Sequence, residues 1–378
     1  MKKLFFTLIA WLFVFALMLP LQNQAATITV TNGNDDGAGS LRAAIAGAMA
    51  GDVIDFSGVT TVTLTSDQLF ISTNLTINGG TGVTITRDAG APNFRIFNIT
   101  SGSAVVEFNK LTITNGKAIP PDGNQAAGIQ NSGTLTLNDC TIANNESGFQ
   151  SGGIQNDKTL TMNRCFVHSN SAPFSGSGLL IYGSSTTTLN NCVFTNNQGN
   201  YAIDIQSAAT LNITNCTIAK NTGGINVGSG SAVVTLKNTI VAENTVNIQN
   251  NVNASSAYNL IGTEGGNGGL TNGTNNNIVG ISPRFANSSD PNGADDKFGT
   301  ADDGLMLTAC NLATNVGNNA DAPSGTDIAG NTRIFNTTVD IGAYEFQANS
   351  SPNPTITLGA IPAILAGATS FTISYTAT

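Results

Sequence analysis

The densest group of side chains that could do chemistry lies near the C-terminus, in the segment DPNGADDKFGTADD. Carboxylate and amide oxygens spaced by glycines are ligands that Ca²⁺ accepts, and the D-x-N-G start is similar to calcium-binding loops. The segment lacks the glutamate that closes an EF-hand, so it is not one. We predict a structural calcium site, with a solvated acidic turn as the open alternative. The candidate ligands are Asp290, Asn292, Asp295, Asp296, Asp302 and Asp303.

A second candidate is a series of T-x-T pairs spread over three similar segments. Alternate residues of a strand face the same side, so each pair would present two hydroxyls together. Such a face could bind a regular lattice such as ice, or a glycan, although Asn212 and Val233 interrupt it. Threonine is also common in exposed strands, so an inert surface stays open. The pairs are Thr134 with Thr136, Thr159 with Thr161, and Thr186 with Thr188.

The remaining charged residues are too scattered to predict a catalytic site. Enzymes that cleave acidic or neutral glycans need clustered carboxylates, or calcium beside a basic residue. Asp139 and Arg164 occupy equivalent places in adjacent repeats and predict an exposed ion pair, while His168 has no carboxylate in register and should be solvated. Three further acidic residues fall at non-equivalent places: Asp157, Asp204 and Glu243. A single Trp leaves little material for an aromatic sugar-binding platform. We predict no catalytic residue.

These residues are positioned by a sequence repeat. The segments TLTLNDCTIANN, TLTMNRCFVHSN, TTLNNCVFTNN and TLNITNCTIAKN align, and their cysteines are separated by 25, 27 and 24 residues. That period suits one solenoid coil made of three short strands. Within a coil, apolar residues alternate with polar ones at period two, as half-buried strands require. The sequence therefore predicts an all-β parallel β-helix with continuous apolar columns.

Four cysteines share one of these columns. Coils stacked about 4.8 Å apart keep equivalent Cβ atoms farther apart than the roughly 3.8 Å that a disulfide prefers. We therefore predict buried free thiols at Cys140, Cys165, Cys192 and Cys216. Cys310 lies outside the repeat and its state is left open.

Asparagines form two further columns. One recurs where the strand direction must change, which suits the left-handed backbone conformation: Asn109, Asn138, Asn163 and Asn190. The other recurs five residues after the cysteine position: Asn145, Asn170, Asn197, Asn221 and Asn244. Stacked amides can hydrogen-bond from coil to coil and satisfy buried turn groups, so we predict ladders rather than sugar-binding sites.

The N-terminus carries an export signal. Lys2 and Lys3 precede the uncharged apolar run of residues 4–19, and small residues follow at Ala25 and Ala26, so residues 1–25 are predicted to be a secretory signal peptide. The mature chain then has no transmembrane segment and is secreted. After it, Ser40 can cap a short helix from Leu41 to about residue 50, inside an N-terminal cap of about residues 32–56.

Composition narrows the partners. Charged residues make up only 10% of the chain, the net charge is -9 and the pI is about 4.4. Nucleic-acid binding relies on basic patches, so it is not expected.

Several stretches resemble a known family. GSLRAAI…GDVIDF and FNITSGSAVVEFNKLTITNG are similar to the start of bacterial right-handed parallel β-helix repeat proteins of pectin-lyase-like fold. The segment from DPNGADDKFGTADDGLML to DIAGNTRIFNTTVDIGAYEF resembles their choice-of-anchor C-terminal region. The GG-I and F/I-x-x-N elements resemble repeats of polymorphic outer-membrane proteins. The resemblance covers about residues 27–347 and implies the right-handed fold and a surface location.

The domain organisation follows. We predict a β-helix over residues 26–347, whose C-terminal cap spans about residues 283–347, then a linker at 348–354. Residues 355–378 alternate like the start of an incomplete immunoglobulin-like module, so further C-terminal domains are expected.

For function, the sequence favours a secreted or cell-surface, adhesin-like β-helix that acts as a stalk or binds glycans or other surface ligands. No cofactor is required beyond the possible structural calcium. The alternative is a carbohydrate-active enzyme, either a polysaccharide lyase or a glycoside hydrolase, because the resemblance implies a fold shared with such enzymes. An ice-binding surface is a minor alternative.

Overall fold

The computed structural model describes residues 25–119, 125–228, 231–309 and 311–347. The predicted signal peptide, Cys310, the linker and the immunoglobulin-like segment lie outside the described residues, apart from residue 25. No helix within the described ranges is long and apolar enough to span a membrane.

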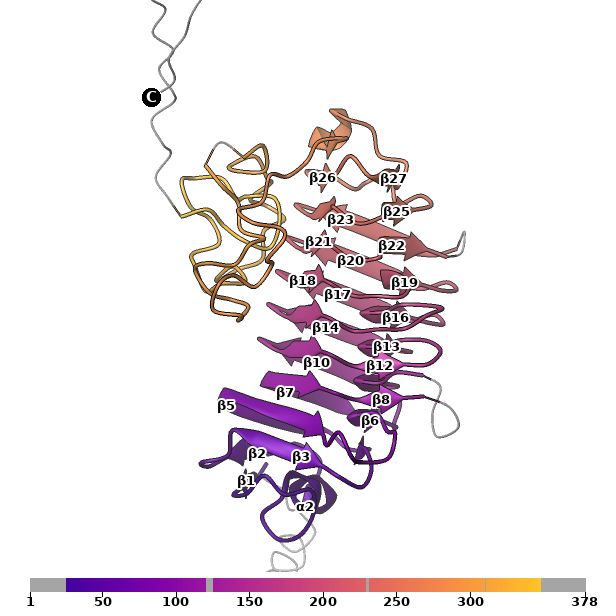
Figure 1. The fold of residues 1–378 in the computed structure, drawn as a ribbon, viewed down its shortest axis with the longest axis vertical. Coiled ribbons are helices and arrows are strands. Elements are labelled where there is room, and N and C mark those ends of the chain that lie inside the picture. Colours follow the sequence, from indigo (N-terminus) through magenta and orange to yellow (C-terminus); the bar gives the residue numbers. More distant parts are fainter. Residues whose placement is uncertain (1–24, 120–124, 229–230, 310, 348–378) are drawn as a thin grey trace, which may run out of the picture.

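The chain winds into a right-handed parallel β-helix, as predicted (Figure 1). A central coil contains three short strands, for example β13 (Ile154–Asn156), β14 (Thr159–Asn163) and β15 (Phe166–His168). The first of these belongs to sheet B and the other two to sheet A. The all-β solenoid and the three strands per coil are therefore confirmed.

Within the described residues, sheet A has 17 strands and sheet B has nine, and a small third sheet pairs β8 (Lys117–Ala118) with β12 (Glu146–Ser147). Besides β14 and β15, sheet A contains β1 (Thr27–Val30), β2 (Asp52–Phe56), β3 (Thr61–Leu64), β5 (Leu75–Arg87), β7 (Val105–Thr114), β10 (Thr134–Asn138), β11 (Thr141–Ala143), β17 (Thr186–Asn190), β18 (Val193–Thr195), β20 (Thr210–Thr214), β21 (Thr217–Ala219), β23 (Val233–Lys237), β24 (Ile240–Ala242), β26 (Leu260–Ile261) and β28 (Ile278–Val279). Besides β13, sheet B contains β4 (Leu69–Ile71), β6 (Phe97–Ile99), β9 (Ile129–Asn131), β16 (Leu179–Ile181), β19 (Tyr201–Ile205), β22 (Gly223–Val227), β25 (Val246–Gln249) and β27 (Gly265–Asn267).

The first coil is covered by helix α2 (Leu41–Gly47). The Ser40 hydroxyl accepts a hydrogen bond from the backbone nitrogen of Ala43 at 3.2 Å, as predicted for the cap. The helix ends earlier than expected, because Ala48 already has an extended backbone. Leu41 is fully buried against the first coil, so the helix seals that end of the core.

The cysteine column is confirmed as buried and free at all four positions: Cys140, Cys165, Cys192 and Cys216. Each thiol lies within hydrogen-bonding distance of a backbone carbonyl, for example Cys192 Sγ at 3.3 Å from the carbonyl oxygen of Asn190. Burial raises the pKa of Cys192 well above its usual value. These thiols are packing groups rather than nucleophiles.

The inner asparagine ladder is also confirmed. From Asn145 to Asn221, each amide Nδ2 donates to the Oδ1 of the next coil, as from Asn170 to Asn197 at 3.1 Å and from Asn197 to Asn221 at 3.0 Å, and the last member, Asn244, donates to Asn247. The same Nδ2 group donates backward to a backbone carbonyl, as from Asn197 to Val167 at 2.9 Å. The members are buried, so the ladder satisfies polar groups at the turn from sheet A to sheet B that water cannot reach.

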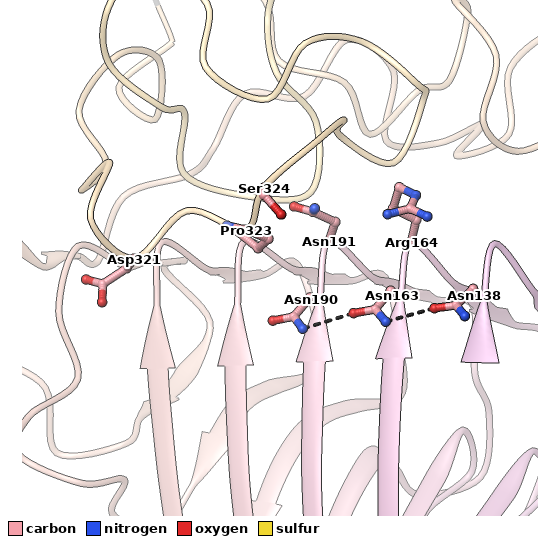
Figure 2. A pocket seen from close by; sticks show the side chains of 8 residues that line it. All are labelled: Asn138, Asn163, Arg164, Asn190, Asn191, Asp321, Pro323 and Ser324. Carbon is pink, nitrogen blue, oxygen red and sulfur yellow. Dashed lines mark hydrogen bonds between the residues drawn. The ribbon is translucent and has the colours of Figure 1, made fainter. Parts of the chain in front are cut away.

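The outer asparagines also form a ladder, but the predicted backbone conformation was wrong by one residue. Asn190 donates to Asn163 at 3.0 Å and Asn163 donates to Asn138 at 2.8 Å (Figure 2). The positive φ angles belong to the residues that follow, including Asp139 at 54° and Arg164 at 51°. The asparagines remain in the strand because their amides must align with the next coil, and the following residue makes the bend.

The C-terminal region, residues 283–347, does not cap the end of the solenoid as predicted. It packs against the side of sheet A, over five successive coils (Figure 1). Leu305 and Tyr344 cluster with Phe166 and Val193, while the last coils are covered by their own loop, whose Leu270 joins the main core. The apolar outward residues of β15, β18, β21, β24 and β26 provide the surface for this docking.

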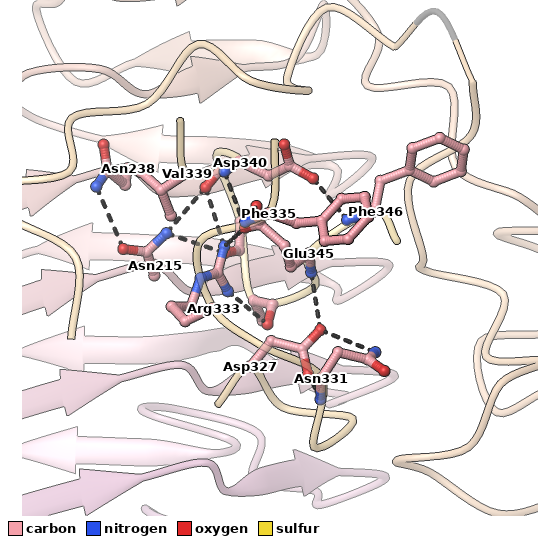
Figure 3. Close-up of polar contacts among 12 residues, drawn as sticks. Asn215, Asn238, Asp327, Asn331, Arg333, Phe335, Val339, Asp340, Glu345 and Phe346 are labelled. Carbon is pink, nitrogen blue, oxygen red and sulfur yellow. Dashed lines mark hydrogen bonds and ion pairs between the residues drawn. The ribbon is translucent and has the colours of Figure 1, made fainter. Parts of the chain in front are cut away.

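A buried ion pair organises the C-terminal region (Figure 3). Arg333 Nη2 lies 3.1 Å from Glu345 Oε2, and both side chains are almost fully buried. The same guanidinium donates to the backbone carbonyls of Ala343 and Asp340 and to Asn191 of the solenoid. Arg333 therefore pairs with Glu345 inside the C-terminal region and links that region to the solenoid through Asn191.

Candidate functional site

The exposed aromatic side chains gather at sheet B. Among the described residues, the strongly exposed ones are Phe70 on β4, Phe149 and Phe174 on the loops before β13 and β16, and Tyr182 directly after β16. The rings of Phe149 and Phe174 lie 5.3 Å apart on successive coils. Folding gains nothing from leaving such rings in water, and exposed aromatics concentrated on one face indicate a binding surface.

A mostly polar column faces outward along sheet B, and its members from Gln130 to Asp204 are buried because preceding loops, such as the one with Ser175, lie over the strands. The neighbouring residues Ile154, Leu179, Ile203 and Ile225 point into the core, so the residues after them face outward. Read along the sheet, the outward column is Phe70, Asn98, Gln130, Gln155, Leu180, Asp204, Asn226 and Gln249. We call these residues, together with Phe149, Phe174, Tyr182 and Tyr201, the sheet B face.

Asp204 is the one acidic residue of this outward column. It is only 3% exposed, and its carboxylate accepts hydrogen bonds from Ser175 Oγ at 2.5 Å and Asn226 Nδ2 at 2.9 Å. Burial raises its pKa, and these hydrogen bonds act in the opposite direction. The adjacent column positions are Leu180 and Asn226, so no second acid lies beside Asp204 in this column.

Tyr201 lies flat on the sheet beside this carboxylate. A Cβ on Gly223 would come within 2.6 Å of the Tyr201 ring, so only glycine permits the ring to cover this position. The hydroxyl reaches Gln249 Oε1 at 3.4 Å, two coils from its own strand. Burial and the nearby Asp204 raise the pKa of Tyr201. An aromatic ring beside a carboxylate and amides is a combination that binds hydroxyl-rich ligands.

A second polar group lies on earlier coils of the sheet B face. Gln130 Nε2 and Gln155 Nε2 donate to the two carboxylate oxygens of Asp157, at 2.5 and 3.0 Å. Arg95 Nη1 donates to Gln130 Oε1 at 3.3 Å, and burial lowers the pKa of this arginine. Gln155 Oε1 is buried and has no hydrogen-bond partner among the described residues, which leaves an acceptor unused.

The threonine pairs lie on the outer face of sheet A in the predicted register. Thr134, Thr159 and Thr186 form one column, and Thr136, Thr161 and Thr188 form the other. None of the six hydroxyls hydrogen-bonds to a residue in the described ranges. The first column continues at Thr210 and is flanked by exposed Val105 and Val233, while the second is flanked by Glu107 and Asn212, so complete threonine pairs span three coils.

The charged residues of sheet A gave one correct and one wrong prediction. Asp139 and Arg164 form the expected partly exposed ion pair, with Nε 2.7 Å from Oδ1. His168 is half-buried rather than solvated, because the C-terminal region packs on it and the centroid of its ring lies 4.6 Å from that of Phe298. Burial lowers its pKa to about 4. His168 is therefore a neutral packing residue at the docked interface.

The structure does not draw the acidic side chains of the predicted calcium segment into one cluster. Asp302 accepts hydrogen bonds from Thr300 Oγ1 at 2.7 Å and from the backbone nitrogen of Asp295 at 3.2 Å. Asp303 is buried and accepts from the Tyr344 hydroxyl at 2.7 Å, and burial raises its pKa to about 6. Within the described ranges, no three His, Cys, Asp or Glu side chains are arranged to hold a metal ion. Calcium binding by Asp290, Asn292, Asp295, Asp296, Asp302 and Asp303 stays a prediction.

The aromatic part of the sheet B face was missed from the sequence. Phe149 and Phe174 each lie nine residues after a cysteine of the repeat, at Cys140 and Cys165. That equivalence predicts two stacked rings on the same turn. The expectation that a single Trp leaves little material for an aromatic platform did not consider phenylalanine and tyrosine.

The comparisons with known proteins agree with this architecture. The family described as "Right handed beta helix region" matches residues 53–240 and 95–282, and the chain belongs to this family. Among solved structures, the chain is similar to the crystal structure of pectate lyase Pel9A, with a TM-score of 0.51 and 13% sequence identity. That match covers 85% of this chain and 96% of the lyase chain, and at this identity it speaks for the fold alone. No curated protein matches the sequence.

Proposed function

We propose that this protein is an exported, surface-acting β-helix that binds an extended polysaccharide along its sheet B face. The observation that carries the proposal is the gathering of the strongly exposed aromatic rings of the described chain on this one face. Sugar rings stack on aromatic faces, and their hydroxyls need amide partners such as the accessible Asn98, Asn226 and Gln249 of the column.

The geometry of the face suits a chain that runs parallel to the solenoid axis. Equivalent side chains of successive coils repeat about every 4.8 Å, which is close to the length of one pyranose unit. Phe149 and Phe174 would take successive sugars, and Tyr201 with the half-buried Asn226, which Asp204 holds in place, would take a later one. A rigid, preorganised row of contacts reduces the entropy lost on binding.

The arrangement of the acidic residues favours binding of a polysaccharide over its cleavage. Hydrolysis of a glycoside uses a pair of carboxylates, one on each side of the scissile bond. Asp204 stands beside Leu180 and Asn226, and Asp157 is held by two glutamines at the edge of the sheet.

A carbohydrate-active enzyme is the second candidate, and one observation favours it. Asp204 is a buried carboxyl group whose pKa is raised, which is the property of a general acid. The fold similarity to a pectate lyase is compatible with either function and does not choose between them.

The test is retention on insoluble polysaccharides, measured by affinity electrophoresis and pull-down. We expect Phe149→Ala with Phe174→Ala to weaken binding at least about tenfold, because each stacked ring is worth about 1 kcal/mol. The matched control is Val105→Ala with Val233→Ala, which removes exposed apolar side chains from sheet A and should leave binding unchanged. Equal retention of both variants would overturn the proposal.

The same preparation decides between binding and catalysis. Release of reducing or unsaturated sugar ends by pure protein, lost in Asp204→Asn, would establish the enzyme. Retention without release, weakened in Asp204→Asn, supports binding.

A further inference from the structure

A polar groove lies between sheet A and the docked C-terminal region, away from the sheet B face (Figure 2). It has a volume of about 430 Å³, within the range of small-ligand sites. Its lining consists of Asn138, Asn163, Arg164, Asn190, Asn191, Asp321, Pro323 and Ser324. None of these residues belongs to the sheet B face.

The floor of the groove is the outer asparagine ladder, and the ladder stops inside it. In each earlier coil, the amide Oδ1 accepts a hydrogen bond from the next asparagine. Thr214 occupies the equivalent place after Asn190, so Asn190 Oδ1 accepts nothing from a described residue. The floor therefore ends in a free acceptor, beside amide N–H groups of Asn163 and Asn190 that the ladder does not use.

The walls supply both hydrogen-bond donors and acceptors without a net charge. Arg164 uses Nε and Nη2 to bind Asp139, which leaves Nη1 without a partner among the described residues. On the other wall, Asp321 forms an ion pair with Lys237, and Ser324 is exposed. Since each charge is already paired, an ionic ligand would gain little here, whereas a hydroxyl could bind to either wall.

The roof of the groove is held in place on both sides. Asn238 exchanges two hydrogen bonds with the backbone of Asn318, at 3.0 and 2.8 Å. Asn191 Nδ2 donates to the carbonyl of Thr326 at 3.1 Å. The intervening loop is thus fixed before any ligand arrives, which lowers the cost of binding.

We propose that this groove binds a neutral saccharide of one or two sugar units. Its hydroxyls would donate to Asn190 Oδ1 and Asp321, and would accept from Asn163 Nδ2 and Arg164 Nη1. Planar amides and one guanidinium, with no exposed aromatic ring in the lining, suit hydrogen bonding to the edge of a sugar rather than stacking on its face.

The experiment is saturation-transfer difference NMR on the mature protein with maltose, cellobiose, lactose and chitobiose at millimolar concentration. To remove the other face, the same spectra are recorded on Phe149→Ala with Phe174→Ala. We expect at least one neutral disaccharide to give transfer that persists in this background. Glucose 6-phosphate and galacturonate should transfer more weakly.

Two variants test the location. Ser324→Tyr fills the groove from the wall that also carries Asp321. Arg164→Met removes the free donor Nη1 and breaks only a partly exposed ion pair, which costs little stability. We expect the transfer to vanish in the first and to fall about fivefold in the second. Ala294→Tyr, an exposed site on the same region outside the groove, should leave it unchanged.

Transfer that survives both groove variants would overturn the proposal, as would its absence from the protein without substitutions. Thermal melting of each variant identifies any loss of fold, and Arg164→Met keeps the test valid if Ser324→Tyr fails to fold.

Discussion

The two outer faces of the solenoid differ although both belong to the same coils. Sheet A is regular, because its two strands in each coil are joined by one left-handed residue such as Asp139, and its surface repeats threonine. Sheet B is preceded by longer turns, and these carry Phe149 and Phe174. Loops tolerate more sequence variation than strands do, so the side chains that could bind a ligand lie in the turns beside sheet B. Sheet A instead receives the C-terminal region.

The largest expected effect concerns the anchoring of that region. Arg333→Ala leaves Glu345 buried without its cation, and breaking a buried ion pair costs about 3–5 kcal/mol. We expect residues 283–347 to lose hydrogen-exchange protection, while the solenoid and the polysaccharide retention of the sheet B face persist. The control Arg164→Ala removes a partly exposed ion pair and should cost about 1 kcal/mol or less. Loss of retention in Arg333→Ala would mean that the two faces are coupled.

A smaller effect separates the two asparagine ladders. Asn197→Ala removes an amide from a fully buried site, which takes the Asn197 Oδ1 acceptor from both the backbone N–H and the side-chain Nδ2 of Asn170. We expect a loss of at least about 2 kcal/mol in urea denaturation, because each buried unpaired group costs about 1–3 kcal/mol. Asn163→Ala, in the partly exposed outer ladder, should cost about half as much, since water can replace the amide. Equal costs would contradict the distinction.

The docked side of sheet A should also give the protein a pH response. His168 has its pKa lowered by burial to about 4, so the native protein stays unprotonated there while the unfolded chain binds a proton below about pH 6.5. Stability should therefore fall as pH drops from about 6.5 to 4, by on the order of 2 kcal/mol from this group. Below about pH 4 this contribution is already lost.

The test is to measure the free energy of unfolding at each pH for the protein and for the His168→Gln variant. Asp303 and Glu345 have pKa values raised to about 6 and about 7, so their contributions change in the opposite direction, falling as pH rises. They are present in both proteins and cancel in the difference. A difference that does not vary between pH 4 and 6.5 would place His168 in solvent.

The smallest expected effect is that of calcium. If the acidic segment binds Ca²⁺ only when folded, a tenfold excess over Kd adds about 1.4 kcal/mol, and melting rises with Ca²⁺ and falls with chelator. Asp295→Asn with Asp302→Asn should abolish this difference, and Mg²⁺ should substitute poorly. A melting temperature that changes with neither calcium nor chelator would show that the acidic segment is a solvated turn.

The parts of the fold predictable from the sequence are those set by contacts between neighbouring coils. The 25-residue step from Cys140 to Cys165 places equivalent residues on one another, so the cysteine column and the inner asparagine ladder follow from spacing. The left-handed residue was misplaced by one position, because the spacing alone does not say whether Asn138 or Asp139 makes the bend.

The docking of the C-terminal region could not be predicted in the same way. Arg333 meets Asn191 across 142 residues, and no repeat connects the two. His168 was assigned to solvent for the same reason, since Phe298 comes from outside its repeat. The sheet B face was within reach of the sequence, because Phe149 and Phe174 keep the repeat spacing, but its buried carboxylate Asp204 depends on the loop that carries Ser175.

The sideways position of the C-terminal region has a mechanical consequence. Coils of a solenoid contact only their neighbours, so a pull on the last coil would peel them one after another. A load applied at Gln347 instead enters through a region attached to five coils at once, from β15 to β26. We expect the coils from β15 to β26 to resist a pulling force in shear and to unfold together, while the coils nearer α2 unfold one at a time.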